Sequence, residues 1–152
     1  MNSTNALLIP QPRYSGALAA AVVIALLLGL ANLLLGDLNQ DEGWYLYAAR
    51  EVSEGRLPYR DYAFTQGPMM PLVYSVFAPV IRDHGVAGGR VVTWLLGIIA
   101  LVLATATARR LGGRAAAVMA YSLIALNVYQ SYFTSVVKTY SLCALFLCAA
   151  LY

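Results

Sequence analysis

The feature that most constrains this chain is a run without any charged residue over positions 15–36. As a helix rising 1.5 Å per residue, such a run reaches about 30 Å, the thickness of the hydrocarbon core of a bilayer. Of the 152 residues, 61% are hydrophobic and 11% are charged. A soluble globular domain is about 25% charged. The sequence therefore predicts an integral membrane protein whose first transmembrane helix covers 15–36.

Three further apolar runs are predicted to form membrane helices, over about 91–108, 115–137 and 139–152. The short loop 109–114, which joins the first two, contains three arginines and no acid. Loops rich in arginine and lysine between membrane helices stay in the cytoplasm. We therefore expect loop 109–114 and the N-terminus to face the cytoplasm, and segment 37–90 to lie on the extracytoplasmic side.

Segment 37–90 contains all seven acidic residues of the chain. We expect it to form an outer loop with two surface helices, over about 40–54 and 68–82. The apolar part of the second is only about 14 residues long and is interrupted by Pro71 and Pro79, so it is too short to cross the bilayer. His84 is interpreted as a loop residue, because no second histidine or cysteine lies near it to complete a metal site. The predicted fold class is all-α, with polytopic transmembrane helices and this one outer loop.

Asp41 and Glu42 are adjacent carboxylates directly after the first membrane helix. Asn39 can cap a helix whose third residue is Glu42, a variant of the capping box, and Gly55 suits the position just after the end of that helix. Acids in a first turn also stabilise a helix by about 0.3–1 kcal/mol through its dipole. The carboxylate pair thus has a structural explanation beside a chemical one.

Four short motifs follow the Asp41-Glu42 pair: GRLPYRD at 55–61, QGPMMPL at 66–72, RRLGGR at 109–114 and KTYSL at 138–142. Together with the first helix and the tyrosine-rich surface helix, this order resembles the N-terminal part of C-type (GT-C) membrane glycosyltransferases. The protein O-mannosyltransferase-like and aminoarabinose lipid A transferase-like branches are the most similar. The resemblance extends over essentially all of this chain but only over the N-terminal part of such an enzyme, so we expect a truncated GT-C module.

The resemblance implies an enzyme of the plasma (inner) membrane that moves a sugar from a polyprenyl-phosphate carrier to an acceptor hydroxyl at the outer face. The catalytic aspartate of the family matches Asp41. A carboxylate within hydrogen-bond reach can take the proton of the acceptor hydroxyl as that oxygen attacks the anomeric carbon. Glu42 is expected to orient the acceptor, to tune Asp41 as a like-charged neighbour, or to help hold a divalent cation.

The chain departs from the aminoarabinose transferase branch at two positions. Gln66 stands where that branch has a glutamate that ligates a metal, and Lys138 lies near the place of a second aspartate. No metal ligand is therefore assigned, and a divalent cation is possible without being required. Lys138 is expected to contact a donor phosphate as a point charge, or to mark the membrane boundary by reaching toward water.

Two further residues are candidates for substrate binding. Tyr45 either stacks on a sugar or anchors the surface helix at the level of the lipid headgroups, as tyrosine and tryptophan commonly do. Arg60 either contacts a phosphate or pairs with its neighbour Asp61 in a solvated loop.

Two other classes of function remain open from the sequence. One is a non-catalytic membrane subunit or fragment, in which Asp41 has no chemistry. The other is a transporter or lipid-handling protein, which should have ionisable residues at mid-membrane depth. The predicted spans 15–36, 91–108 and 115–137 contain none. The expected partners are the lipid bilayer and a polyprenyl-phosphate-linked sugar. Nucleic acid is not among them, since no basic stripe with interleaved aromatics is present.

Overall fold

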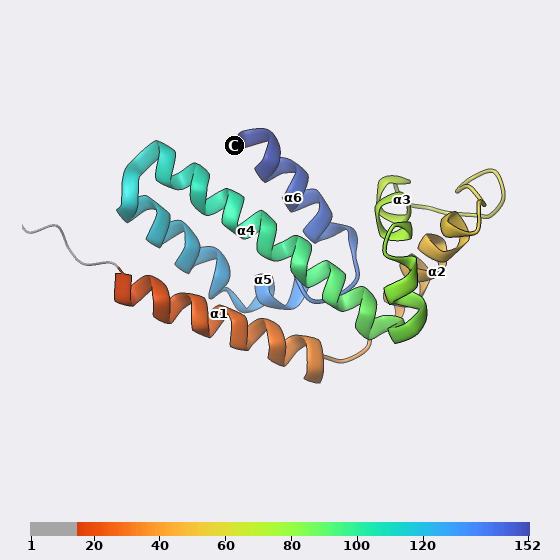
Figure 1. Cartoon of the computed structure of the whole chain (residues 1–152), viewed down its shortest axis with the longest axis horizontal. Coiled ribbons are helices and arrows are strands. Elements are labelled where there is room, and N and C mark those ends of the chain that lie inside the picture. The colour runs from red at the N-terminus through yellow and green to blue at the C-terminus, as the bar shows by residue number, and fades with distance from the viewer. Residues whose placement is uncertain (1–14) are drawn as a thin grey trace, which may run out of the picture.

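The structure, a computed structural model, describes residues 15–152, and over that range it consists of helices without a strand (Figure 1). The prediction of an all-α fold is confirmed. The sidedness predicted for the N-terminus falls on residues 1–14, outside the described residues. The helices are α1 (Ser15–Leu35), α2 (Gln40–Ser53), α3 (Met69–Ser75), α4 (Ala78–Ala125), α5 (Val128–Phe133) and α6 (Thr139–Leu151).

Glycines divide α4 into three straight parts, 78–84, 86–111 and 114–125. Gly85 has φ 57° and Gly113 has φ 72°, a left-handed conformation that glycine adopts without a steric penalty. The turn at Gly112 and Gly113 reverses the chain, so that 86–111 and 114–125 run side by side in opposite directions (Figure 1). The predicted loop 109–114 is therefore reduced to this glycine pair, with helix continuing up to it.

The helix expected over 115–137 is wrong in its extent, because it ends at Ala125. The side-chain oxygen of Asn127 accepts a hydrogen bond from the Gln130 N–H at 3.2 Å and so begins the short helix α5. An asparagine that bonds the nearby backbone in this way competes with continuation of the preceding helix. The part 114–125 is about 18 Å long, well short of a full crossing.

The two predicted surface helices have different outcomes. A helix close to the bounds of the first is present as α2, which begins after Asn39 and ends before Gly55, where φ is 86°. Its place on the membrane surface stays a prediction. The second, expected over 68–82, is instead divided into α3 and the start of α4. Pro79 lies in the first turn of α4, where its missing N–H is tolerated, whereas within a continuous helix its ring would clash with the preceding turn. His84, expected in a loop, is the last residue before the break at Gly85.

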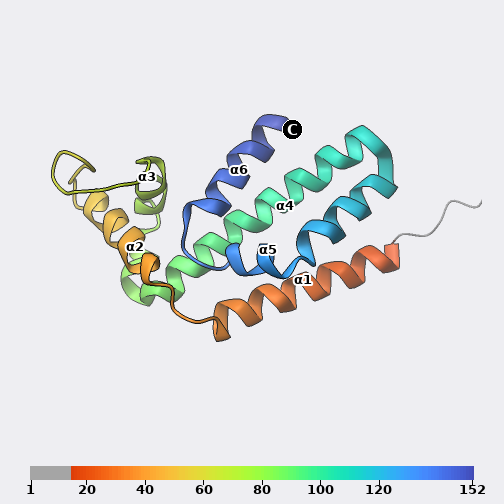
Figure 2. The same ribbon diagram turned by 180° about the vertical axis from the view of Figure 1, so that it is seen from behind.

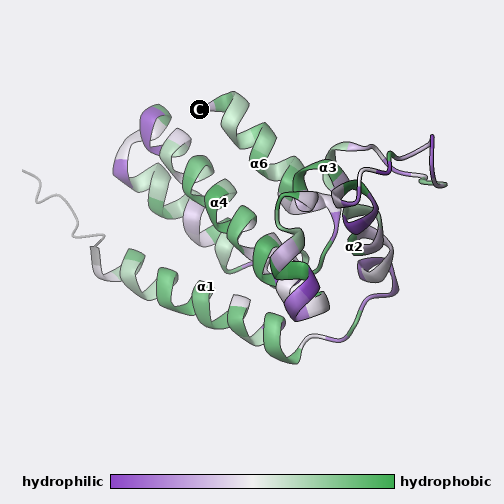
Figure 3. Ribbon diagram, turned by 45° about the vertical axis from the view of Figure 1, so that its right-hand side comes forward, coloured by the Kyte–Doolittle hydropathy of each residue, from purple (hydrophilic) through white to green (hydrophobic). Residues whose placement is uncertain are grey.

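Helices α1 and α6 pack against α4, which lies between them (Figure 1 and, from behind, Figure 2). Within residues 15–152, α1 and α4 are the helices whose length and composition would allow them to cross a membrane. Large apolar side chains of α1 are exposed, among them Leu27 at 61% and Leu34 at 67%, and the helix is hydrophobic along its length (Figure 3). An exposed apolar surface of this extent is a contact surface for lipid or for other protein segments.

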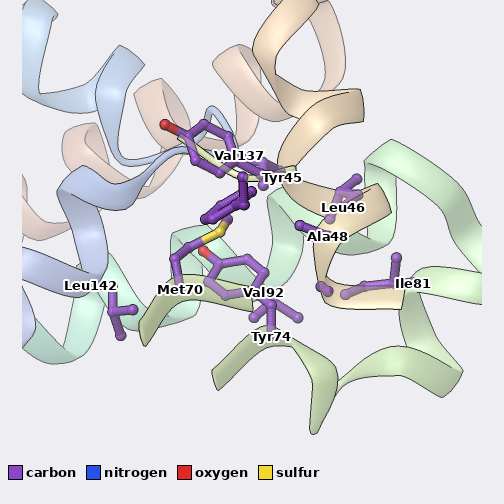
Figure 4. Close-up of a cluster of buried hydrophobic side chains, with 11 residues drawn as sticks. Tyr45, Leu46, Ala48, Met70, Tyr74, Ile81, Val92, Val137 and Leu142 are labelled. Carbon is purple, nitrogen blue, oxygen red and sulfur yellow. The ribbon is translucent and has the colours of Figure 1, made fainter. Parts of the chain in front are cut away.

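Helices α2 and α3 gather at one end of the bundle, opposite the glycine turn of α4 (Figure 1). We call this end the α2 end. Its core joins α2, α3, α4 and the segment before α6, with Leu46, Tyr74, Val92 and Val137 among its buried side chains (Figure 4). This core fixes the orientation of α2 relative to the long helices.

Candidate functional site

The candidate site begins at the first turn of α2. The side-chain oxygen of Asn39 accepts a hydrogen bond from the Asp41 N–H at 3.0 Å, and Glu42 Oε2 accepts one from the Asn39 N–H at 2.9 Å. The predicted capping box is therefore confirmed. The cap directs the two neighbouring carboxylates into different environments. The Asp41 side chain is 48% exposed, whereas that of Glu42 is 1% exposed.

Glu42 accepts four hydrogen bonds on its two carboxylate oxygens. Arg90 donates two of them, from Nε to Oε1 at 2.8 Å and from a terminal nitrogen to Oε2 at 2.7 Å. The Val137 N–H donates the third, to Oε1 at 3.0 Å, and the Asn39 N–H donates the fourth. Paired guanidinium–carboxylate bonds of this kind are among the strongest hydrogen bonds in proteins.

Arg90 also binds the chain at the end of α1. Its terminal nitrogens donate to the carbonyl oxygens of Gly36 at 2.9 Å and of Asp37 at 2.7 Å. The Glu42–Arg90 pair therefore ties together the end of α1, the start of α2, helix α4 and the segment that leads into α6. Because both side chains are buried, removing one partner would leave an uncompensated charge in the interior.

The surroundings of Glu42 keep it ionised. Burial by itself would raise the pKa of this carboxyl. The hydrogen bonds from Arg90, Asn39 and Val137 outweigh burial and hold the pKa below its ordinary value. With four donors on two oxygens and almost no exposure, Glu42 acts on the site by holding its parts in place.

Asp41 forms a second ion pair beside the first. Lys138 Nζ lies 2.8 Å from Asp41 Oδ2, and the lysine side chain is 16% exposed. Lys138 directly follows Val137, whose N–H is held by Glu42, so the two consecutive acids face two consecutive residues of the segment before α6. The hydrogen bond with Asp41 raises the pKa of Lys138, which therefore stays charged.

Tyr45 lies one helical turn after Asp41 and is 7% exposed. Its ring packs edge-on against Phe64, with the ring centroids 6.5 Å apart. Burial raises the pKa of Tyr45 and the nearby Asp41 carboxylate adds to the shift, so the hydroxyl stays protonated. The structure thus brings Tyr45 to the site, with most of its ring covered by protein.

Arg60 is not brought to this site by any contact among the described residues. Its terminal nitrogen lies 2.8 Å from Asp61 Oδ2, which is the pairing expected from the sequence, and its side chain is 66% exposed. The proposed contact of Arg60 with a phosphate stays a prediction.

Arg90 is the functional residue that sequence reasoning missed. Its signal was a single arginine at the start of the uncharged stretch 91–108, directly after Gly88 and Gly89. A charged residue at such a position needs a partner, and Glu42 is the acid that the fold supplies. Gly89 permits the approach, since a Cβ there would lie 2.6 Å from a methyl group of Leu46 on α2.

The arrangement combines an accessible carboxylate with a lysine ammonium at the α2 end of an apolar bundle. A carboxylate of this kind can accept a proton from a hydroxyl, and the ammonium can bind a phosphate oxygen. Among residues 15–152, no three histidine, cysteine or acidic side chains gather into a group that could hold a metal ion. Gln66 uses its backbone oxygen to accept a hydrogen bond from the Tyr59 hydroxyl.

Comparisons of the chain with protein-family models, with curated proteins and with solved structures found no match. The resemblance to GT-C glycosyltransferases therefore rests on the sequence motifs alone, and the activity that it implies is treated as a proposal.

Proposed function

We propose that this chain is a membrane glycosyltransferase module that moves a sugar from a polyprenyl-phosphate carrier to an acceptor hydroxyl. The observation that supports the proposal is the half-exposed Asp41 carboxylate, held 2.8 Å from the Lys138 ammonium at one end of a bundle of apolar helices. A lipid-linked donor keeps its phosphate at the membrane surface, so both groups are needed at that level.

The chemistry assigns one role to each residue. The acceptor oxygen attacks the anomeric carbon and loses its proton to Asp41, which acts as the general base. The bond between the anomeric carbon and the phosphate oxygen breaks, and its electron pair stays on the phosphate. Lys138 stabilises the negative charge that grows on this leaving group. The ion pair of Glu42 with Arg90 holds Asp41 and Lys138 in their relative positions.

The proposed setting is the plasma membrane, with α1 and the 86–111 part of α4 spanning it. Arg109, Arg110 and Arg114 flank the glycine turn, at the end of the bundle away from α2. Under the positive-inside rule that end faces the cytoplasm. The N-terminus is then cytoplasmic, and segment 37–90 is extracytoplasmic together with Asp41 and Lys138.

The direct test is the Asp41→Asn variant of the full chain, assayed for transfer from a panel of polyprenyl-phosphate-linked sugars. We expect transfer to fall at least about 100-fold, the scale of a lost general base, with insertion into the membrane unchanged. The matched control is Asp37→Asn, which removes the same charge four residues earlier from an exposed side chain outside the ion pairs. Transfer that survives Asp41→Asn would remove Asp41 from the mechanism.

A further inference from the structure

We propose that the Asp41–Lys138 ion pair is an exchange switch. The phosphate of the lipid-linked donor takes Lys138 away from Asp41, and only then is Asp41 free to act as a base. This inference rests on the proposed function and adds to it an order of events, with the donor bound before the acceptor is deprotonated.

The first ground is that the base is occupied in the structure described. Asp41 Oδ2 lies 2.8 Å from Lys138 Nζ, the distance of a charge-assisted hydrogen bond. While the ammonium stays in this position, Oδ2 already accepts a hydrogen bond and cannot also receive the proton of an acceptor hydroxyl. Transfer of a proton from a hydroxyl to Oδ2 therefore requires the ammonium to leave.

The second ground is that Lys138 is fixed at its backbone and free at its tip. The N–H of the preceding residue, Val137, is bound by buried Glu42, and the Val137 side chain is fully buried. The Lys138 side chain is 16% exposed, and a lysine ammonium has three donors on a flexible stem. It can change partners without moving a helix. Arg90, whose guanidinium is held by Glu42 and by the carbonyls of Gly36 and Asp37, has no such freedom.

The third ground is the balance between the two acceptors that compete for Lys138. An ion pair with a half-exposed partner is worth only about a 1.4- to 5-fold factor in an equilibrium. A donor phosphate presents at least one full negative charge. This charge grows as the bond to the sugar breaks, and a phosphate monoester reaches about −1.5 to −2 at pH 7. The exchange is therefore accessible when the donor binds, and it becomes more favourable toward the transition state.

The experiment measures binding of farnesyl phosphate, a short polyprenyl monophosphate, to the full chain in nanodiscs at pH 7.5, with farnesol as the uncharged control ligand. We expect Asp41→Asn to tighten farnesyl phosphate binding about 1.4- to 5-fold, because Lys138 is no longer engaged. Lys138→Gln should weaken it, and adding Asp41→Asn to Lys138→Gln should restore nothing. Farnesol should bind all variants alike.

Two results would overturn the switch. One is an Asp41→Asn variant that binds farnesyl phosphate no more tightly than the unchanged chain. The other is an equal gain in the Lys138→Gln background, since that gain would come from simple repulsion between Asp41 and the phosphate. Both readouts are independent of catalysis. If Asp41→Asn loses transfer but binds farnesyl phosphate no more tightly, the switch is rejected and the proposed function is kept. If Asp41→Asn binds farnesyl phosphate more tightly but the unchanged chain transfers no sugar, the proposed function is rejected and the exchange of Lys138 is kept.

Discussion

Replacing Glu42 with glutamine tests whether the buried ion pair holds the site together. The two carboxylate oxygens each accept two hydrogen bonds, Oε1 from Arg90 and Val137 and Oε2 from Arg90 and Asn39. A glutamine has one oxygen and one NH₂ group. Whichever way its amide is turned, the NH₂ group faces two donors.

The free energy of unfolding that Glu42→Gln should lose follows from the burial of Glu42 and Arg90. The side chains of Arg90 and Glu42 are 5% and 1% exposed, so Glu42→Gln leaves a buried guanidinium without its counter-charge. Loss of one partner of a buried pair costs about 3–5 kcal/mol. We expect a loss of that size in the free energy of unfolding, measured by denaturant titration of the full chain in detergent micelles.

The loss of stability caused by Glu42→Gln is expected to depend on pH in a definite direction. The pKa of Glu42 lies below its ordinary value of 4.5 in the folded chain, so its stabilisation is present above that value. It is lost as the pH falls through the folded pKa, where the protonated carboxyl comes to resemble the amide. The difference between the unchanged chain and Glu42→Gln should therefore be full at pH 7 and shrink below pH 4.5.

Glu54→Gln is the matched control, because Glu54, the residue directly after α2, forms exposed ion pairs with Arg50 and Arg56. Such surface pairs contribute little, so this variant should be as stable as the unchanged chain. A loss below about 1 kcal/mol for Glu42→Gln, or a deficit that does not change with pH, would refute the reasoning.

Two further predictions concern topology and packing. In a background without native cysteines, Asp83→Cys should react with a membrane-impermeant maleimide in intact cells and Leu111→Cys, at a position 84% exposed, should not; the reverse pattern would invert the proposed orientation. Tyr74→Phe should lower the free energy of unfolding by about 0.5–1.5 kcal/mol, because it removes the buried hydrogen bond of 2.7 Å with Thr93. Burial raises the pKa of Tyr74 to about 12, so titration from pH 8 to 10 should leave this contribution intact, and a loss within that range would contradict it.

The sequence by itself determined the features that depend on neighbouring residues. A run without charge predicted α1, and the spacing from Asn39 to Glu42 to Gly55 predicted α2 and its cap, because each signal lies within a turn or two of what it specifies. Asn127 and Pro79 are local signals of the same kind. There, a single side chain ends or begins a helix inside a run whose hydrophobicity continues.

Only the tertiary structure decided which charges meet. Glu42 and Arg90 are 48 positions apart, and Glu42 and the Val137 N–H are 95 apart. The sequence pattern around each of these residues does not indicate which distant residue it contacts. The pairing follows from how α2 packs across the ends of α1 and α4, with Leu46 against Gly89. That packing depends on the shapes of the helix surfaces that meet, which the hydrophobic periodicity of each helix does not specify. The sequence therefore pointed to Asp41 as an acid at a helix start, while its ion pair with Lys138 required the fold, since proximity in space across such separations is set by the packed core.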